Sequence, residues 1–463
     1  MYPESRVHNV LKEIWQRSML TAENLRKDAA ARKLDYFNNE QREHLLAQIA
    51  SLYKWPDKLI PVNVNVVRQI VRALSMVYLR DAVRTVEGST QDQEVYAFIE
   101  DTAALPTKMK KCSRLAKLLG NTLLRPLWRN GKPDLDILTG DVLTVFTGDS
   151  PEDIQGVLVT LYDDSGDTGR VLYSLWTDEE YRLIDHRGNT ISTEENPYRT
   201  IPFVSVWNSP PTGSFWQNGA DDLMMAQDAI NQRLSDIFYV ARFQGFGLGY
   251  VKGKGTSTED LDNLIVGPGS MMTLPEDGEV GFASPQAPIM DSLEAIDRLM
   301  KWAAVSNGLS ASSVSTAVTQ ESGVAKVAGN AALEEMRRDD IANFARVEDQ
   351  LFKMWRVIWN YHNPGRPMSD SAVVQVSFYD PKPTIDPYDQ WRIWQEKMQA
   401  GLISPIDILI AENPDLTREA AKKKFDRIRE ELMEFKPPEV GGGPTGSLSQ
   451  RLTDILNNPP DPA

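Results

Sequence analysis

The stretch ADDLMMAQDAINQRLSDIFYVARFQ, residues 220–244, decides the architecture of this chain. It predicts a long helix, because Asp221 and Asp222 stand in the first turn, where the helix dipole favours negative charge. A second predicted helix, PIMDSLEAIDRLMKWAAVSNG, occupies residues 288–308. The insert between them, about 246–287, contains glycine turns, a predicted short helix (TEDLDNLI) and a predicted strand (SMMTL). The pattern predicts a stalk of two helices with a small β-containing tip.

Upstream of the stalk, residues 4–120 show helical spacing, with predicted helices at 39–53, 64–87 and 91–119. The strongest segment is PVNVNVVRQIVRALSMVYLRD, which Asn63 or Asn65 can cap. Its apolar side chains fall on one stripe, formed by Val66, Ile70, Val71, Leu74, Val77 and Tyr78.

From about 123 to 207 the apolar period changes to two, and turn residues separate the runs. Such alternation predicts strands, and here a largely antiparallel sheet. The connection NSPPTGSFWQNG ends this region before the first stalk helix. The chain is therefore expected to be α+β, with its helices in the majority.

Downstream of the stalk, the segment LSASSVSTAVTQESG is rich in serine and threonine. A long helix follows, predicted to bend near Gly329 and to carry an apolar stripe between Phe344 and Trp359. A strand, SAVVQVSFYD, then precedes two predicted helices, DQWRIWQEKMQAGLIS and TREAAKKKFDRIREELMEF. Taken alone, the long helix fits an interaction helix or a coiled coil, but neither explains the stalk before it.

Composition narrows the class of protein. The chain has 463 residues, a formal net charge of −15, one cysteine (Cys112) and four histidines, so an internal disulfide and a zinc-binding spacing are both excluded. The apolar runs are too short to span a membrane, and the N-terminus has no signal-peptide pattern. The acidic balance opposes tight DNA binding, although it suits a conduit along which DNA slides. We expect assembly in the cytoplasm, with no membrane, metal or cofactor.

The motifs give little support to an enzyme. The glycine run GFGLGYVKGKGTS could approach a phosphate with Lys252 or Lys254, but its spacing does not fit a phosphate-binding loop and a turn leaving the helix explains it better. Adjacent acids such as Asp339 and Asp340 point about 100° apart on a helix, which indicates solvated faces. The basic run KKKFDRIR could touch phosphate, yet it too fits a solvated face.

The order of these segments resembles the portal proteins of tailed double-stranded DNA bacteriophages. The resemblance spans nearly the whole chain and is carried by PVNVNVVRQIVRALSMVYLRD, by CSRLAKLLGNTLLRPLWRNGKPDLDIL and by NPYRTIPFVSVWN before the stalk. After the stalk it continues in QESGVAKVAGNAALEEMRRDDIANFARVEDQL and FYDPKPTIDPYDQWRIWQEKMQAGLIS. Each motif is loose by itself, and their order around a small insert gives the match its specificity.

The resemblance implies a portal fold with a wing, a stem, a clip, a tunnel loop and a crown. Carried over to this sequence, its parts are the wing at 1–216, stem helix 1 at 217–245, the clip at 246–287, stem helix 2 at 288–309, the tunnel loop at 310–321, the long bent wing helix at 322–369, the crown at 370–436 and a Pro/Gly-rich tail at 437–463. It also implies a non-enzymatic ring, usually of twelve subunits, at the unique capsid vertex of the virion.

The implied sites follow from these assignments. The tunnel loop would contact DNA through Ser310, Ser312, Ser313, Ser315, Thr316, Thr319 and Gln320. Arg298 and Lys301 are candidates for positive charge in the stem channel, although helical spacing also allows them to pair with Glu294 or Asp297. The clip would meet its partners through Glu259, Asp260, Asp262, Glu276, Asp277 and Glu279, and solubility alone would also account for these acids.

The implied partners are double-stranded DNA passing through without sequence specificity, the large terminase subunit, adaptor, head-completion or tail proteins, and the major capsid or scaffolding protein. The rival interpretation is a helical scaffold, monomeric or dimeric, that has no part in DNA passage. Observation of a ring would distinguish the two hypotheses, since a monomeric or dimeric scaffold would not form a ring.

Overall fold

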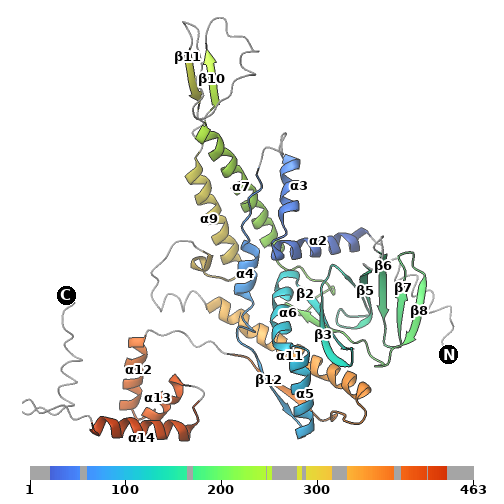
Figure 1. Cartoon of the computed structure of the whole chain (residues 1–463), viewed down its shortest axis with the longest axis vertical. Coiled ribbons are helices and arrows are strands. Elements are labelled where there is room, and N and C mark those ends of the chain that lie inside the picture. The colour runs from blue at the N-terminus through green and yellow to red at the C-terminus, as the bar shows by residue number, and fades with distance from the viewer. Residues whose placement is uncertain are drawn as a thin grey trace, which may run out of the picture. The chain divides into compact units, whose positions relative to one another are not determined.

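The computed structural model describes residues 21–52, 60–163, 170–246, 248–252, 279–283, 288–314, 331–379, 387–413 and 416–434. The chain divides into two compact units, Met1–Lys382 and Pro383–Ala463, and Figure 1 labels most of their helices and strands. Both helices and antiparallel strands are present, so the predicted mixture of helix and sheet is confirmed.

The described chain opens with three helices, α2 (Thr21–Asn38), α3 (Arg42–Leu52) and α4 (Val66–Leu74). Asn65 caps α4, because its side-chain oxygen accepts a hydrogen bond from the backbone N–H of Arg68 at 2.8 Å. The predicted helix over 64–87 is too long. Helix α4 ends at Leu74, and Val83–Glu87 forms strand β1.

The predicted helix over 91–119 is in fact two helices, α5 (Thr90–Thr102) and α6 (Leu105–Leu119). The break falls at Ala103 and Ala104, and Ala104 has a left-handed φ of 52°. Pro106 follows in the first turn of α6, where its missing N–H is harmless. In the middle of one continuous helix, the same proline would remove a hydrogen bond and clash with the preceding turn.

The alternating region forms two antiparallel sheets. One sheet has the order β3-β2-β9 and contains β2 (Asn121–Arg129), β3 (Lys132–Leu138) and β9 (Val204–Trp207). The other is a meander of β4 (Leu143–Thr147), β5 (Ile154–Asp163), β6 (Arg170–Trp176), β7 (Glu180–Ile184) and β8 (Thr190–Glu195). The antiparallel prediction is confirmed, whereas the single sheet is wrong, because β2 pairs with β9 from the far end of the region.

The stalk consists of α7 (Asp221–Phe246) and α9 (Ile289–Ser306), which pack against each other. Strands β10 (Leu248–Lys252) and β11 (Glu279–Ala283) pair antiparallel where α7 ends and α9 begins, as Figure 1 shows. The glycine run was predicted to be a turn, and this is wrong for the residues of β10, which pairing with a distant strand holds extended. The short helix and the strand predicted at 258–265 and 270–274 lie outside the described residues.

Helix α11 (Ala331–His362) runs through the largest hydrophobic cluster of the first unit. The predicted stripe is confirmed, because Phe344, Val347, Leu351, Trp355 and Ile358 are all buried. The bend predicted near Gly329 lies outside the described residues.

Strand β12 (Val373–Ser377) pairs antiparallel with β1, and Val86 lies opposite Val374. The predicted strand is therefore present. Strand β12 therefore belongs to the first unit, whereas the helices that follow it along the chain belong to the second.

The second unit contains α12 (Pro387–Gln399), α13 (Pro405–Glu412) and α14 (Arg418–Glu434). The sequence predicted two helices here, the first extending to Ser404. It ends at Gln399 because Gly401 adopts a φ of 70°. Ser404 then starts α13 through a capping box with Asp407.

Candidate functional site

The stalk helices α7 and α9 form the centre of the candidate site. Leu223 and Ile230 of α7 and Ile296 and Ala304 of α9 are buried in one hydrophobic cluster. Side chains of α2, α4 and α6 complete the same cluster. Because burial of apolar surface is the main source of stability, this cluster fixes the base of the stalk to the helices around it.

A row of polar side chains on α7, which we call the amide ladder, consists of Gln227, Asn231 and Ser235, spaced four residues apart and each buried. Gln227 Oε1 accepts from the backbone N–H of Val66 at 2.8 Å, and its Nε2 donates to the carbonyl of Val64 at 2.5 Å. Asn231 Oδ1 accepts from the N–H of Val64 at 3.3 Å. The side chains of α7 therefore satisfy the backbone N–H and carbonyl groups of the extended segment before α4, as the backbone of a paired strand would do.

The ladder makes two further hydrogen bonds. Ser235 Oγ accepts from the backbone N–H of Val62 at 3.0 Å, and Asn231 Nδ2 donates to Gln41 Oε1 at 2.8 Å. The sequence analysis placed these residues on a helix but gave them no role. The available signal was amide and hydroxyl side chains recurring every fourth residue on one helix face.

Arg298 and Lys301, the predicted channel charges, lie on α9, and each pairs with a carboxylate one turn earlier. Arg298 Nη2 is 2.6 Å from Glu294 Oε1, and Lys301 Nζ is 2.5 Å from Asp297 Oδ2. The pairing that helical spacing allowed is therefore present. All four side chains are exposed enough for solvent to screen the pairs, which are each worth at most about 1 kcal/mol, so another anion can compete for these cations.

The predicted DNA-facing loop starts directly after α9, in the short 3₁₀ helix η2 (Ala311–Val314). Ser313 Oγ donates to the carbonyl of Ser310 at 2.6 Å, and the Oγ atoms of Ser310 and Ser312 are 3.0 Å apart. Val314 is buried in the stalk cluster and anchors this turn. The other predicted loop residues lie outside the described part of the chain: Ser315, Thr316, Thr319 and Gln320.

The predicted acidic tip is described in part. Glu279 is exposed at the first position of β11, and its backbone lies opposite Lys252 of β10. Opposite charges at facing positions favour pairing of two strands. The remaining predicted acids lie outside the described residues: Glu259, Asp260, Asp262, Glu276 and Asp277.

A buried ionic network ties α11 to β1. The side chains of Arg84 and Glu348 are both fully buried, and Arg84 Nη2 lies 2.6 Å from Glu348 Oε1. Arg84 also pairs with Glu100 at 2.7 Å, and the hydroxyl of Tyr78 donates to Glu348 at 2.8 Å. Burial, reinforced by the negative charge of Glu348, raises the pKa of Tyr78 well above its usual value, so Tyr78 remains a donor. The sequence analysis did not identify this network.

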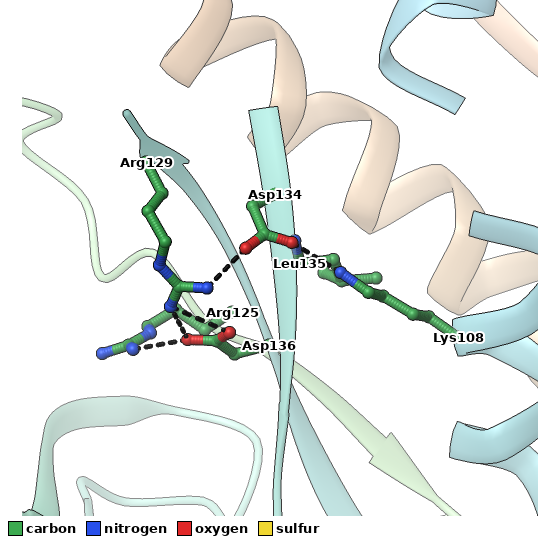
Figure 2. A network of polar contacts seen from close by, with 6 residues as sticks. All are labelled: Lys108, Arg125, Arg129, Asp134, Leu135 and Asp136. Carbon is green, nitrogen blue, oxygen red and sulfur yellow. Dashed lines mark hydrogen bonds and ion pairs between the residues drawn. The ribbon is translucent and has the colours of Figure 1, made fainter. Parts of the chain in front are cut away.

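A second charge network fixes the β2–β3 hairpin (Figure 2). Arg129 bonds to Asp134 and, at 2.9 Å, to Asp136, while Arg125 reaches Asp136 at 2.6 Å. Lys108 of α6 lies 2.5 Å from Asp134. Burial alone would raise the pKa of Asp134, but the hydrogen bond from Lys108 and the neighbouring cations hold it below its usual value. Arg125 and Arg129 therefore join β2 to β3, and Lys108 joins the hairpin to α6.

Across the part of the chain that the structure describes, no group of side chains is arranged to hold a metal ion, and no helix is long and apolar enough to cross a membrane. Cys112 is fully buried, with its Sγ 3.5 Å from Thr122 Oγ1, and burial raises the pKa of its thiol to about 12. Such a thiol is inert at neutral pH.

A two-helix stalk that carries a pair of strands is built onto a larger body of helices and sheets. The family described as "Phage portal protein, SPP1 Gp6-like" matches residues 62–436, and the chain belongs to this family. Portal proteins are structural, non-enzymatic components of the capsid, so the function class predicted from the sequence is confirmed.

Solved structures that match this chain include chains of gene transfer agent (GTA) particles. A chain of the "Neck of empty GTA particle computed with C6 symmetry" is 12% identical, covers 75% of this chain and 90% of its own length, and has a TM-score of 0.45. A chain of the "Virion of native gene transfer agent (GTA) particle" is 14% identical, with coverages of 75% and 88% and a TM-score of 0.41. A comparison with curated proteins finds no match.

Proposed function

We propose that this chain forms a closed ring at the unique capsid vertex and that double-stranded DNA enters and leaves through its channel. The observation that carries the proposal is the match to the portal family over residues 62–436. The ring would number twelve subunits, as the resemblance implies. A separate ATPase would drive the DNA.

Large apolar side chains on the stalk support ring formation. Phe238 of α7 and Met290, Trp302 and Val305 of α9 are all more than half exposed. In a ring, one heterologous contact repeated around an axis would cover these side chains. These side chains are our candidates for contacts between neighbouring stalks.

The charges of the chain suit a channel that conducts DNA without holding it. Each copy contributes a net −15, so a ring would repel DNA over most of its surface. Arg298 and Lys301, already paired, would offer local and exchangeable positive charge, and the hydroxyls of Ser310, Ser312 and Ser313 would touch phosphates without fixing them. This combination favours sliding.

The remaining partners are proposed from the family resemblance. The clip at 246–287 would meet the large terminase subunit during packaging and adaptor, head-completion or tail proteins later. The wing at 1–216 and 322–369 would contact major capsid or scaffolding protein. Assembly would take place in the host cytoplasm and the product would reside in the virion.

The state of assembly tests the proposal. Size-exclusion chromatography with light scattering should give a single large oligomer, and negative-stain electron microscopy should show rings with a central hole. Trp302→Glu should shift the population toward monomer, because it places a charge in the contact between stalks, whereas Glu294→Gln on the same helix should not. A chain that stays monomeric or dimeric at every concentration would reject the ring and favour a helical scaffold.

A further inference from the structure

The pair Asn-Gly occurs three times in the sequence, at residues 130–131, 218–219 and 307–308. Asparagine before glycine is prone to spontaneous deamidation, in which the backbone nitrogen of the glycine attacks the Cγ atom of the asparagine. Glycine favours the attack because it has no side chain to hinder that nitrogen or to restrict the backbone. The three pairs share this chemistry, so the fold decides which of them can react.

The first pair forms the turn between β2 and β3. Arg129 lies opposite Lys132 across the hairpin, so the turn consists of Asn130 and Gly131 alone. Their φ angles of 52° and 74° are both positive, as a type I′ turn requires. Both residues are exposed, and a side chain built on Gly131 would meet nothing within 4 Å. Water therefore has access to both reacting groups.

This turn leaves the two reacting groups without hydrogen bonds. Among the described contacts, neither the side-chain amide of Asn130 nor the backbone N–H of Gly131 has a hydrogen-bond partner. The backbone nitrogen can therefore lose its proton to solvent, and the amide can rotate toward it. Both events must occur before the attack.

The pair at 307–308, after the C-terminal end of α9, is held by hydrogen bonds. Asn307 Nδ2 donates to Asp222 Oδ2 and to the carbonyl of Ala303, both at 2.9 Å. The N–H of Gly308 donates to the carbonyl of Val305 at 3.0 Å. Attack would require these bonds to break, and each broken bond slows the reaction. The fold therefore protects Asn307.

The pair at 218–219 is held by backbone packing. Asn218 is exposed, but a side chain built on Gly219 would clash with the carbonyl oxygen of Leu118 and with the backbone nitrogen of Gly120. The next residue, Ala220, donates its N–H to the same carbonyl at 2.9 Å. Ring closure requires the peptide between asparagine and glycine to rotate, and close packing of this kind opposes the rotation.

We propose that Asn130 is a site of spontaneous deamidation in the folded chain and that the other two asparagines are protected. The nitrogen of Gly131 forms a bond to Cγ of Asn130, the bond from Cγ to Nδ2 breaks, and ammonia leaves with the proton of the N–H. Water then opens the resulting succinimide ring. Addition of water at Cγ gives aspartate, and addition at the main-chain carbonyl gives isoaspartate. Nothing is oxidised or reduced, and the inference does not depend on the proposed ring.

The products would change the β2–β3 hairpin. Isoaspartate adds one carbon atom to the backbone, so the turn no longer has the geometry that a two-residue hairpin requires. Aspartate places a negative charge beside Arg129, which already bonds to Asp134 and Asp136 (Figure 2). Either product should therefore weaken the charge network that joins β2 to β3.

Peptide mapping of the aged protein tests the proposal. The folded full-length chain would be kept at mildly alkaline pH for several weeks and digested at mildly acidic pH, which limits deamidation during digestion. Mass spectrometry would follow replacement of NH2 by OH in each of the three peptides, and an isoaspartate methyltransferase would label the isoaspartate. Asn130 should react at least about tenfold faster than Asn218 or Asn307, because only its pair has no contact to break.

Two controls separate the fold from the local sequence. In urea the three rates should converge, because the contacts of Asn307 and Gly219 are lost. Asn130→Gly keeps a residue that tolerates positive φ and removes the amide, so labelling of the folded chain should disappear. Three outcomes would contradict the proposal: similar rates at all three sites in the folded chain, reaction of Asn130 in urea alone, or an equal advantage of Asn130 in urea. The second would show that the hairpin protects the pair, and the third that the flanking residues set the rate.

Discussion

Two adjacent acids on α11 differ sharply in their surroundings. Glu348 is fully buried and accepts hydrogen bonds from Arg84 and Tyr78. Asp349, the next residue, is 36% exposed and pairs with Lys353 at 2.6 Å on the same helix. A buried charge that loses its partner keeps its desolvation penalty, whereas water and salt compensate an exposed one. The same type of charge is therefore essential at one position and dispensable at the next.

Glu348→Gln should lower the free energy of unfolding of the first unit by about 3 kcal/mol, since Arg84 remains buried with only Glu100 as a counter-charge. Asp349→Asn should change it by less than about 0.5 kcal/mol. Urea unfolding followed by tryptophan fluorescence would measure both, because Trp355 and Trp359 belong to the same cluster. Equal effects of the two substitutions would show that burial does not decide the value of these charges.

For single residues, the sequence indicated which side chains are buried through their periodic spacing, but it did not indicate which side chains contact each other. The α11 stripe from Phe344 to Ile358 follows from local spacing, and it was predicted. The Arg84–Glu348 pair joins residues 264 positions apart, and no local pattern distinguishes Glu348 from a solvated glutamate on a helix. Arg84 was also assigned to a helix, although it lies on strand β1.

The amide ladder provides a prediction at the scale of an element. Gln227→Leu should leave the backbone N–H groups of Val66 and Val67 and the carbonyl of Val64 without their partner on α7. An unmet buried polar group costs about 1–3 kcal/mol, so the segment before α4 should open more often. Hydrogen exchange at residues 62–67 should rise at least about tenfold, the ratio that 1.4 kcal/mol represents.

Gln232 supplies the control for this substitution. It lies on the same helix, is only partly buried and has no hydrogen bond to the segment before α4 among the described contacts. Gln232→Leu makes the same chemical change and should leave exchange at residues 62–67 unchanged. If both variants exchange alike, α7 holds the segment by apolar packing and not through the ladder.

Helices and strands differed in how far the sequence could specify them. The stalk helices could be predicted because helical spacing is visible within a short stretch of sequence. Their predicted ends lie within a few residues of those observed. The break before Pro106 had a local signal that the sequence analysis did not use. Strand β1 had no sufficient local signal, because its pairing with β12 joins residues such as Val86 and Val374, which lie far apart in the chain.

For the whole molecule, the family could be predicted because many loose motifs occur in one sequence order. The division into wing, stem, clip, tunnel loop and crown stays a prediction. The number of sheets could not be predicted, since it depends on which strands pair with one another. The predicted site is only partly brought together. Ser310, Ser312 and Ser313 follow the C-terminal end of α9, and Arg298 and Lys301 lie on this helix. Contact of these groups with DNA requires the assembled ring.

The loop after α9 gives the last prediction, and its design follows from Val314. This residue is buried in the stalk cluster, so a deletion that removed it would damage packing as well as the loop. Deleting residues 315–318 should leave rings intact by negative-stain microscopy and should reduce the amount of DNA packaged or retained, measured as nuclease-protected genome per particle. Val314→Asp, in contrast, should impair folding or assembly, because it buries an unpaired charge. Loss of rings on deleting 315–318 would show that the segment is a subunit interface and not a DNA contact.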